Sequence, residues 1–242
     1  MTAHTVAILG FHKIGEPSPG GWESWFYIPE RVFVEQLNYL KTHRWPVIDL
    51  AAFLRGVDDP DCLPERAVLL TFDDAYRSLV HVALPRLIQL RYPAVVFVPT
   101  EFIGRLNAFD ADEEPEEAIC GWEDLRELER DHISVQSHGV SHRPLSQLTC
   151  AEQEQELVRS KAVLERGLNK PVDVFAYPYG DAGLGRDWRE KRKALRGALQ
   201  RAGYRAAFLY GGRPQHLPAR DRFRLARVAM GPDTDLEAEL LR

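Results

Sequence analysis

The stretch Ala-Val-Leu-Leu-Thr-Phe-Asp-Asp-Ala-Tyr-Arg-Ser, residues 67–78, combines an apolar run with two adjacent carboxylates. The run Ala67–Leu70 is typical of a strand buried on both faces of a parallel sheet. Asp73 and Asp74 follow, and helical periodicity begins after them. Because neighbouring side chains on a strand point to opposite faces, both carboxylates reach one site only if the chain curls at the carboxyl end of this strand. Parallel α/β folds place their active sites at that end.

Two carboxylates so close together repel each other, and one is protonated unless a cation lies nearby. The pair alone does not decide its role. A chemical site is one interpretation. The ordinary alternative makes Asp74 the N-cap of the next helix and leaves Asp73 in solvent.

The composition indicates one globular domain, residues 1–242, because 45% of the 242 residues are hydrophobic and 28% are charged. A formal net charge of −5 without a basic run argues against nucleic-acid binding and a polybasic membrane anchor.

No apolar run is long enough to span a membrane. The first residues read as a strand rather than a signal peptide. We therefore expect a cytoplasmic protein, although an exported protein whose signal had been trimmed would look identical. The three cysteines, Cys62, Cys120 and Cys150, do not suggest a disulfide framework.

Apolar runs and helical patterns alternate about seven times, which predicts a parallel sheet with helical crossovers. At this length we expect an α/β fold, a distorted (β/α) barrel of about seven strands, with an open doubly wound sheet as the alternative. No glycine-rich nucleotide motif follows a strand. The predicted strands are Val6–Phe11, Trp45–Asp49, the central stretch, Ala94–Val98, His132–Gln136, Val172–Tyr177, Ala206–Tyr210 and Arg224–Ala229.

Helical patterns follow Pro29 and cover Leu50–Arg55, where Gly56 is the expected end. The helix after Asp74 is expected to kink near Pro85. A capping box of Thr149 and Glu152 starts a helix to about Glu165, with Gly167 beyond it. The remaining helices are Trp122–Arg130, Trp188–Arg201 and a short acidic one at the end of the chain. Residues 101–120 are polar and are interpreted as a long surface loop or lid, with a solvated acidic part at 110–117.

His138 and His142 lie four residues apart just after a predicted strand. If one helical turn forms there, both imidazoles share a face and can bind one ion. Two imidazoles and one of the two aspartates make a three-ligand site with open positions, which suits Zn²⁺, Fe²⁺, Co²⁺ or Ni²⁺. The other carboxylate is then available as a general base for a bound water.

Three motifs together resemble the polysaccharide deacetylase family (carbohydrate esterase family 4, the NodB-homology domain). They are Thr71-Phe72-Asp73-Asp74, residues 137–142 (Ser-His-Gly-Val-Ser-His) and residues 175–180 (Phe-Ala-Tyr-Pro-Tyr-Gly), in that order and each after a strand. Phe11-His12-Lys13-Ile14, ahead of these motifs, is similar to the circularly permuted branch, which includes poly-β-1,6-N-acetylglucosamine deacetylases.

The resemblance implies a role for each matching residue. Asp73 would be the general base, and Asp74, His138 and His142 would bind one divalent metal ion, with zinc as the first expectation. His12 would be the general acid that protonates the leaving amine; its ordinary alternative is a hydrogen-bonded histidine at a strand end. Tyr179 would offer its backbone N–H to the oxyanion; the alternative is a simple proline-containing turn.

The chain departs from the family pattern in several places. Ala75 stands where the family usually has glycine, and the arginine that tethers the base is missing before Pro178. Arg227 is our hypothesis for its replacement, and Asp181 is a candidate to orient His12. The tryptophans are candidates for a sugar-stacking wall or acetyl pocket, or for core packing and loop anchoring: Trp22, Trp25 and Trp122.

The expected function is metal-dependent hydrolysis of N-acetyl groups on a poly- or oligo-N-acetylglucosamine type of carbohydrate. The same fold and metal could serve another linear amide or a cyclic imide. A non-catalytic carbohydrate-binding relative is a further alternative, although both aspartates and both histidines are present. The last alternative function is that of an iron oxygenase, whose iron is bound by two histidines and one carboxylate. The sequence does not determine substrate length, metal identity or oligomeric state.

Overall fold

Seven parallel strands follow one another around a curled sheet in the order of the chain. The computed structural model describes residues 4–111, 113–182 and 189–241. The strands are β1 (His4–Phe11), β4 (Arg66–Phe72), β5 (Ala94–Val98), β6 (Ile133–Ser137), β7 (Val174–Ala176), β8 (Ala206–Phe208) and β10 (Val228–Ala229). β9 (Gln215–Leu217) adds to β1 in antiparallel orientation. β2 (Lys13–Ile14) and β3 (Tyr27–Ile28) form a separate parallel pair.

One segment near the carboxyl terminus closes the sheet into a barrel. Leu225 pairs with Phe208 of β8, and three residues later Val228 of β10 pairs with Leu9 of β1. The segment therefore contacts the last and the first strand of the chain-ordered sheet. This confirms the distorted (β/α) barrel and excludes the open doubly wound sheet.

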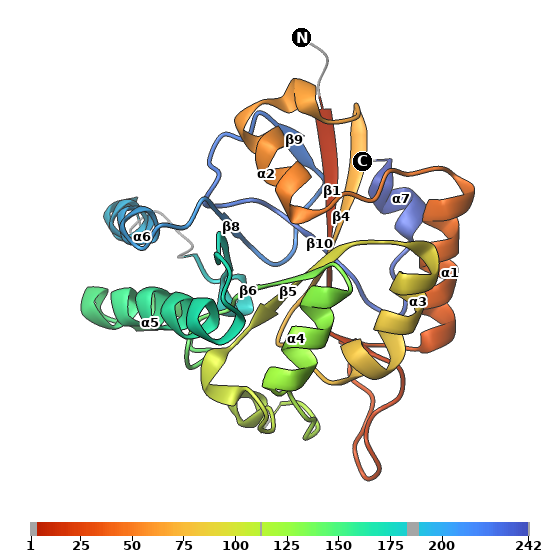
Figure 1. Cartoon of the computed structure of the whole chain (residues 1–242), viewed down its shortest axis with the longest axis horizontal. Coiled ribbons are helices and arrows are strands. Elements are labelled where there is room, and N and C mark those ends of the chain that lie inside the picture. Colours follow the sequence, from red (N-terminus) through yellow and green to blue (C-terminus); the bar gives the residue numbers. More distant parts are fainter. Residues whose placement is uncertain (1–3, 112, 183–188, 242) are drawn as a thin grey trace.

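Helices surround the strands on the outside (Figure 1). They are α1 (Glu30–Thr42), α2 (Leu50–Asp58), α3 (Leu84–Leu90), α4 (Trp122–Arg130), α5 (Cys150–Leu168), α6 (Arg189–Arg201) and α7 (Leu236–Leu240). The capping box of Thr149 and Glu152 is confirmed. Trp188, where α6 was expected to begin, lies outside the described residues.

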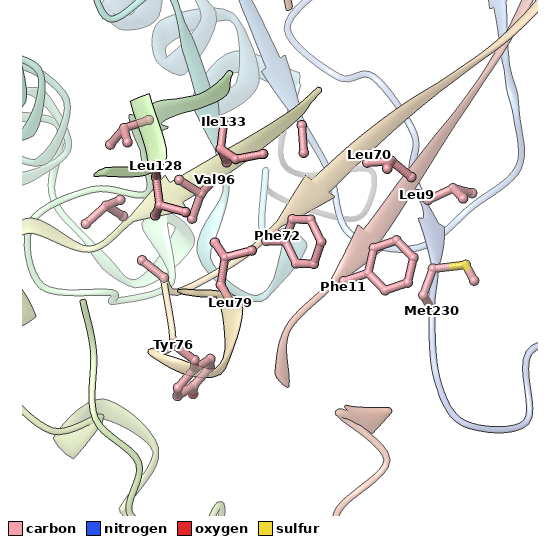
Figure 2. Packing of buried hydrophobic residues seen from close by; sticks show 14 of the residues in the cluster. Leu9, Phe11, Leu70, Phe72, Tyr76, Leu79, Val96, Leu128, Ile133 and Met230 are labelled. Atoms are coloured by element: carbon pink, nitrogen blue, oxygen red, sulfur yellow. The ribbon is translucent and has the colours of Figure 1, made fainter. Parts of the chain in front are cut away.

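Strand residues alternate between two hydrophobic layers. Val6 and Ile8 point into the barrel, where Phe53 of α2 packs with them. Leu9 and Phe11 point outward, on the same side as Leu70 and Phe72 (Figure 2), and Phe11 packs against Phe33 of α1. Because successive side chains point to opposite faces, each polar residue at the end of a strand points either into the barrel or outward.

Two glycines that were expected to end helices lie inside them. A β-carbon at Gly56 would lie 2.1 Å from Leu63, and one at Gly167 would lie 2.1 Å from the ring of Trp122. These glycines make room for a neighbouring side chain, so α2 and α5 continue past them. Their helices end instead at Asp58 and Leu168.

The predicted strand Trp45–Asp49 is wrong, since only Val47 pairs, through a single bridge to Val68. The helix after Asp74 also begins later than expected. It opens with a π-helical turn, Leu79–Ala83, directly before α3, where Pro85 lacks an N–H donor and so disturbs the regular ladder.

Residues 100–120 are not a detached lid. Short 3₁₀ turns at Thr100–Phe102 and Ala108–Asp110 and a bridge between Leu106 and Ala118 give the segment its own structure. Ile119 is buried in the core. Among the described residues, no helix combines the length and the apolar character needed to span a bilayer.

Candidate active site

Alternation along the strands directs several polar side chains to one end of the barrel interior. On β4, Ala67 and Leu69 point inward, so Thr71 and Asp73 continue on the same face. The chain then turns sharply, with positive φ at Asp74 (65°) and Ala75 (57°). This curl brings the second carboxylate to the same pocket, as expected, and both aspartates are buried. Asp74 is therefore not the N-cap of a helix.

Asp74 lies against both histidines of the 137–142 motif. Its Oδ1 is 3.5 Å from Nε2 of His138 and 3.1 Å from Nε2 of His142. Ligand atoms of the three residues all lie within 4.8 Å of one another. Asp74 Oδ1 is buried and has no hydrogen-bond partner among the described residues, and burial raises the pKa of this carboxyl. A buried, unpaired oxygen beside two imidazoles fits a divalent cation.

The helical turn that was considered as one way to bring the two histidines together does not form. The chain forms an irregular loop with positive φ at Gly139 (85°) and His142 (56°). Glu156 of α5 holds this loop: its carboxylate accepts hydrogen bonds from the backbone N–H groups of Val140 (2.6 Å) and Ser141 (3.0 Å). Contacts with Glu156, rather than helical spacing, therefore hold the loop that brings the two histidines together.

His138 is oriented from behind by the neighbouring strand. Its Nδ1 lies 2.8 Å from the carbonyl oxygen of Ala176, which leaves Nε2 facing Asp74. Such a backbone contact fixes the tautomer of a metal-binding histidine. Glu156 and Ala176 were not foreseen from the sequence, because neither belongs to a local pattern around the histidines.

Asp73 is paired with Arg227, as hypothesised for the missing arginine. The guanidinium donates to Oδ1 (2.7 Å) and Oδ2 (2.6 Å) of Asp73, and its Nε donates to the carbonyl of Leu209 (2.6 Å). Arg227 is fully buried. Burial by itself would raise the pKa of the Asp73 carboxyl, but the charge and hydrogen bonds of Arg227, together with the nearby His138 and His12, outweigh it and hold that pKa well below its usual range. Asp73 is therefore ionised.

His12 lies beside Asp73, with Nε2 at 3.8 Å from Oδ2. Its ring packs against Phe26 (centroids 4.7 Å apart) and edge-on against Tyr210 (4.9 Å). Burial lowers the pKa of His12. Asp181 was a candidate to orient this ring, but its carboxylate accepts a hydrogen bond from the backbone N–H of Ser146. Aromatic packing, rather than a second carboxylate, holds His12.

The acidic segment 110–117 contributes to the pocket, so the prediction of a solvated loop is wrong. Glu114 is buried and forms an ion pair with Lys13 (2.6 Å), whose ammonium lies over the rings of Tyr27 and Tyr76. Asp110 accepts the hydroxyl of Tyr179 (2.9 Å).

Burial, with help from the charge of Asp74, raises the pKa of Asp110 to about 6. Tyr179 has a positive φ of 56°, lies in the turn after β7 and lines the pocket. Its ring centroid is 4.7 Å from that of His142.

The three tryptophans have different fates. Trp122 packs against Gly167 of α5 and is not among the described residues that line the pocket. Trp22 and Trp25 are 53% and 41% exposed. Neither lines the pocket itself, so none of the three forms an acetyl pocket.

The sequence model of the family described as polysaccharide deacetylase matches residues 61–207. The chain belongs to the polysaccharide deacetylase family. It is 26% identical over 178 residues to YxkH of Bacillus subtilis (strain 168), which is named for that family. It is 25% identical over 164 residues to a poly-beta-1,6-N-acetyl-D-glucosamine N-deacetylase of Staphylococcus aureus (strain MRSA252). These matches cover 72% and 64% of the chain but only 57% and 54% of the two relatives.

The fold of this family member is also found in a solved structure, the Streptococcus pyogenes deacetylase PplD in complex with acetate. The TM-score is 0.80, and the match covers 99% of this chain and 98% of PplD. At 22% identity this likeness shows the shared fold.

Proposed function

We propose that this chain is a metal-dependent hydrolase that removes N-acetyl groups from an amino sugar of the poly- or oligo-N-acetylglucosamine type. The observation that carries the proposal is that the two neighbouring aspartates have different surroundings. Asp74 faces His138 and His142 with a free oxygen, while Asp73 is held by Arg227 within reach of His12. The substrate is suggested by the name of the S. aureus relative, of which the chain spans about half.

Asp74, His138 and His142 would hold the cation, zinc by preference, which would polarise the acetamide carbonyl and acidify a water molecule. Asp73 then accepts the proton of the attacking water. Because Arg227 keeps Asp73 ionised, this acceptor is ready at neutral pH. Its low pKa also makes it a weak base, so it needs an acidified water.

His12, which is neutral in the resting site, receives the water proton from Asp73 and donates it to the leaving amine, since an amide anion is too basic to leave. Its Nε2 faces Asp73 Oδ2, so proton uptake and proton delivery occur on neighbouring atoms. The backbone N–H of Tyr179 is the proposed donor to the oxyanion. The complete set of two aspartates and three histidines argues against a non-catalytic carbohydrate-binding role.

The test compares wild type with Asp74→Ala and Asp73→Asn after loading with Zn²⁺. Metal content is measured by elemental analysis, and acetate release is measured with N-acetylglucosamine oligomers. We expect one metal per chain in wild type and in Asp73→Asn, little in Asp74→Ala, and acetate release by wild type alone. Metal binding without acetate release would redirect the proposal to other amides. Failure to bind Zn²⁺, Co²⁺ or Ni²⁺ would overturn the mechanism.

A further inference from the structure

An exposed tryptophan extends the aromatic wall of the pocket outward. Phe26 lines the pocket and packs against His12, with the ring of Tyr210 at 6.3 Å. Trp25 stands edge-on to Phe26, with centroids 5.7 Å apart, and 41% of it is exposed. An exposed aromatic ring beside a pocket offers an apolar face on which a ligand can pack.

Trp25 is also fixed in place. Its indole N–H donates to Asp233 Oδ1 at 2.8 Å. Beneath it lies Gly231, where a β-carbon would approach the indole Cε2 to 2.2 Å. Only glycine allows this close approach. A surface ring held by both contacts loses little freedom when a ligand covers it.

We propose that Trp25 and Phe26 form a subsite for a further sugar of an oligomeric substrate, with Trp25 stacking on the sugar adjacent to the one being deacetylated. The inference rests on the proposed function, because the sugar that carries the leaving amine must lie on the side of His12. Phe26 walls that side, and Trp25 is the next ring outward. The substrate is therefore a glycan chain rather than a free monosaccharide.

The chemistry of the wall suits a pyranose, which has apolar C–H faces and hydroxyl groups at its edges. The aromatic rings of Trp25 and Phe26 offer the apolar surface. The hydroxyl of Tyr210, which also lines the pocket, is buried and has no hydrogen-bond partner among the described residues. A sugar hydroxyl would satisfy it.

The test compares Trp25→Ala with Trp22→Ala, an exposed tryptophan on the same loop that makes no ring contact with described residues of the pocket. Acetate release is measured with N-acetylglucosamine and with its pentamer. We expect the ratio of kcat/KM for pentamer to kcat/KM for monosaccharide to fall about tenfold in Trp25→Ala. In Trp22→Ala the ratio should stay at the wild-type value. An unchanged ratio in Trp25→Ala would overturn the subsite.

Calorimetric titration of the same proteins with the pentamer separates the subsite from the deacetylase proposal. If wild type binds the pentamer about tenfold more tightly than Trp25→Ala does but releases no acetate, the subsite stands and the proposed function fails. If acetate is released and Trp25→Ala binds the pentamer as tightly as wild type does, the proposed function stands and the subsite fails. A wild type that does not bind the pentamer overturns the subsite.

Gly231→Ala provides a second variant that keeps the indole but displaces it. We expect a fall in the same kcat/KM ratio, with an unchanged circular dichroism spectrum. A wild-type ratio in this variant would contradict the role of a fixed ring.

Discussion

Two buried ion pairs border the pocket, and they are built differently. Arg227 and Asp73 meet inside the barrel through two parallel hydrogen bonds, with Arg227 Nε on a backbone carbonyl. Lys13 and Glu114 meet at the rim through a single contact of 2.6 Å, between the short strand β2 and the loop that follows β5. The Lys13 ammonium completes its surroundings with aromatic rings.

The difference shows why each residue type stands where it does. A guanidinium presents a planar fork of donors, so Arg227 fixes both the orientation and the charge of the Asp73 carboxylate. An ammonium is a point charge that tolerates several directions, so Lys13 is suited to joining β2 to a segment of irregular chain. One pair sets the chemistry, and the other holds the rim.

The largest effect is expected from Arg227→Met, which leaves the carboxylate of Asp73 buried without its partner. We expect a loss of about 3–5 kcal/mol in the free energy of unfolding, measured with urea. Acetate release should fall at least about 100-fold, because the pKa of Asp73 rises and its position is lost. The double variant Arg227→Met/Asp73→Asn should regain part of the stability and none of the activity. Equal stability of Arg227→Met and wild type would contradict the comparison.

Lys13→Met should have a smaller effect on both quantities. Glu114 keeps a hydrogen bond from the Ser24 hydroxyl (2.6 Å), so we expect a loss of about 1–3 kcal/mol in unfolding free energy. Because the rim would loosen while Asp73 stays in place, KM should rise more than kcat falls. Steady-state kinetics check this, with Lys13→Arg as the control that keeps the charge. A fall in kcat as large as in Arg227→Met would show that the two pairs do not have separate roles.

Acid should lower the stability of the chelator-treated protein, because buried histidines lie between the two ion pairs. Burial lowers the pKa of His142 to about 4, from 6.5 in the unfolded chain, so the unfolded chain binds more protons between these values. Stability therefore falls as pH falls through this window, and His12 and His138, whose pKa values are also lowered, act in the same direction. The raised pKa of Asp110, about 6, acts in the opposite direction.

We expect the melting temperature to drop by a few degrees between pH 7 and pH 5. Asp110→Asn removes one of two opposing contributions, the other being the raised pKa of Asp74, and should make the drop steeper. A melting temperature that rises toward pH 5 would be inconsistent with neutral buried histidines.

The smallest effect is expected at Ala75, in the sharp turn that follows the two aspartates. Ala75 has a φ of 57°, a conformation that glycine adopts at little cost. Ala75→Gly should raise the unfolding free energy by about 0.5 kcal/mol, since relief of strain exceeds the added entropy of the unfolded chain. Ala83→Gly, in the π-helical turn, is the matched control and should lower it by about 1 kcal/mol. Destabilisation of equal size in both variants would show that the turn is not strained.

Much of the fold could be predicted because its signals are local. Apolar runs such as Ala94–Val98 mark buried strands, and their alternation with helical patterns predicts a parallel sheet with helical crossovers; the closure of that sheet into a barrel is seen only in the structure. Errors arose where a neighbour changed the meaning of a residue. Gly56 and Gly167 look like helix ends in the sequence, but Leu63 and Trp122 occupy the space that a side chain would need.

The sequence by itself determined that Asp73, Asp74 and His138 stand at the ends of predicted strands, and therefore that they would meet, while the family resemblance added His12. This follows because parallel strands share one carboxyl edge. The tertiary structure decided their partners. Arg227 reaches Asp73 across 154 residues, and Lys13 reaches Glu114 across 101. Such pairs depend on how the barrel closes and which loops meet above it, and local sequence patterns carry no information about either.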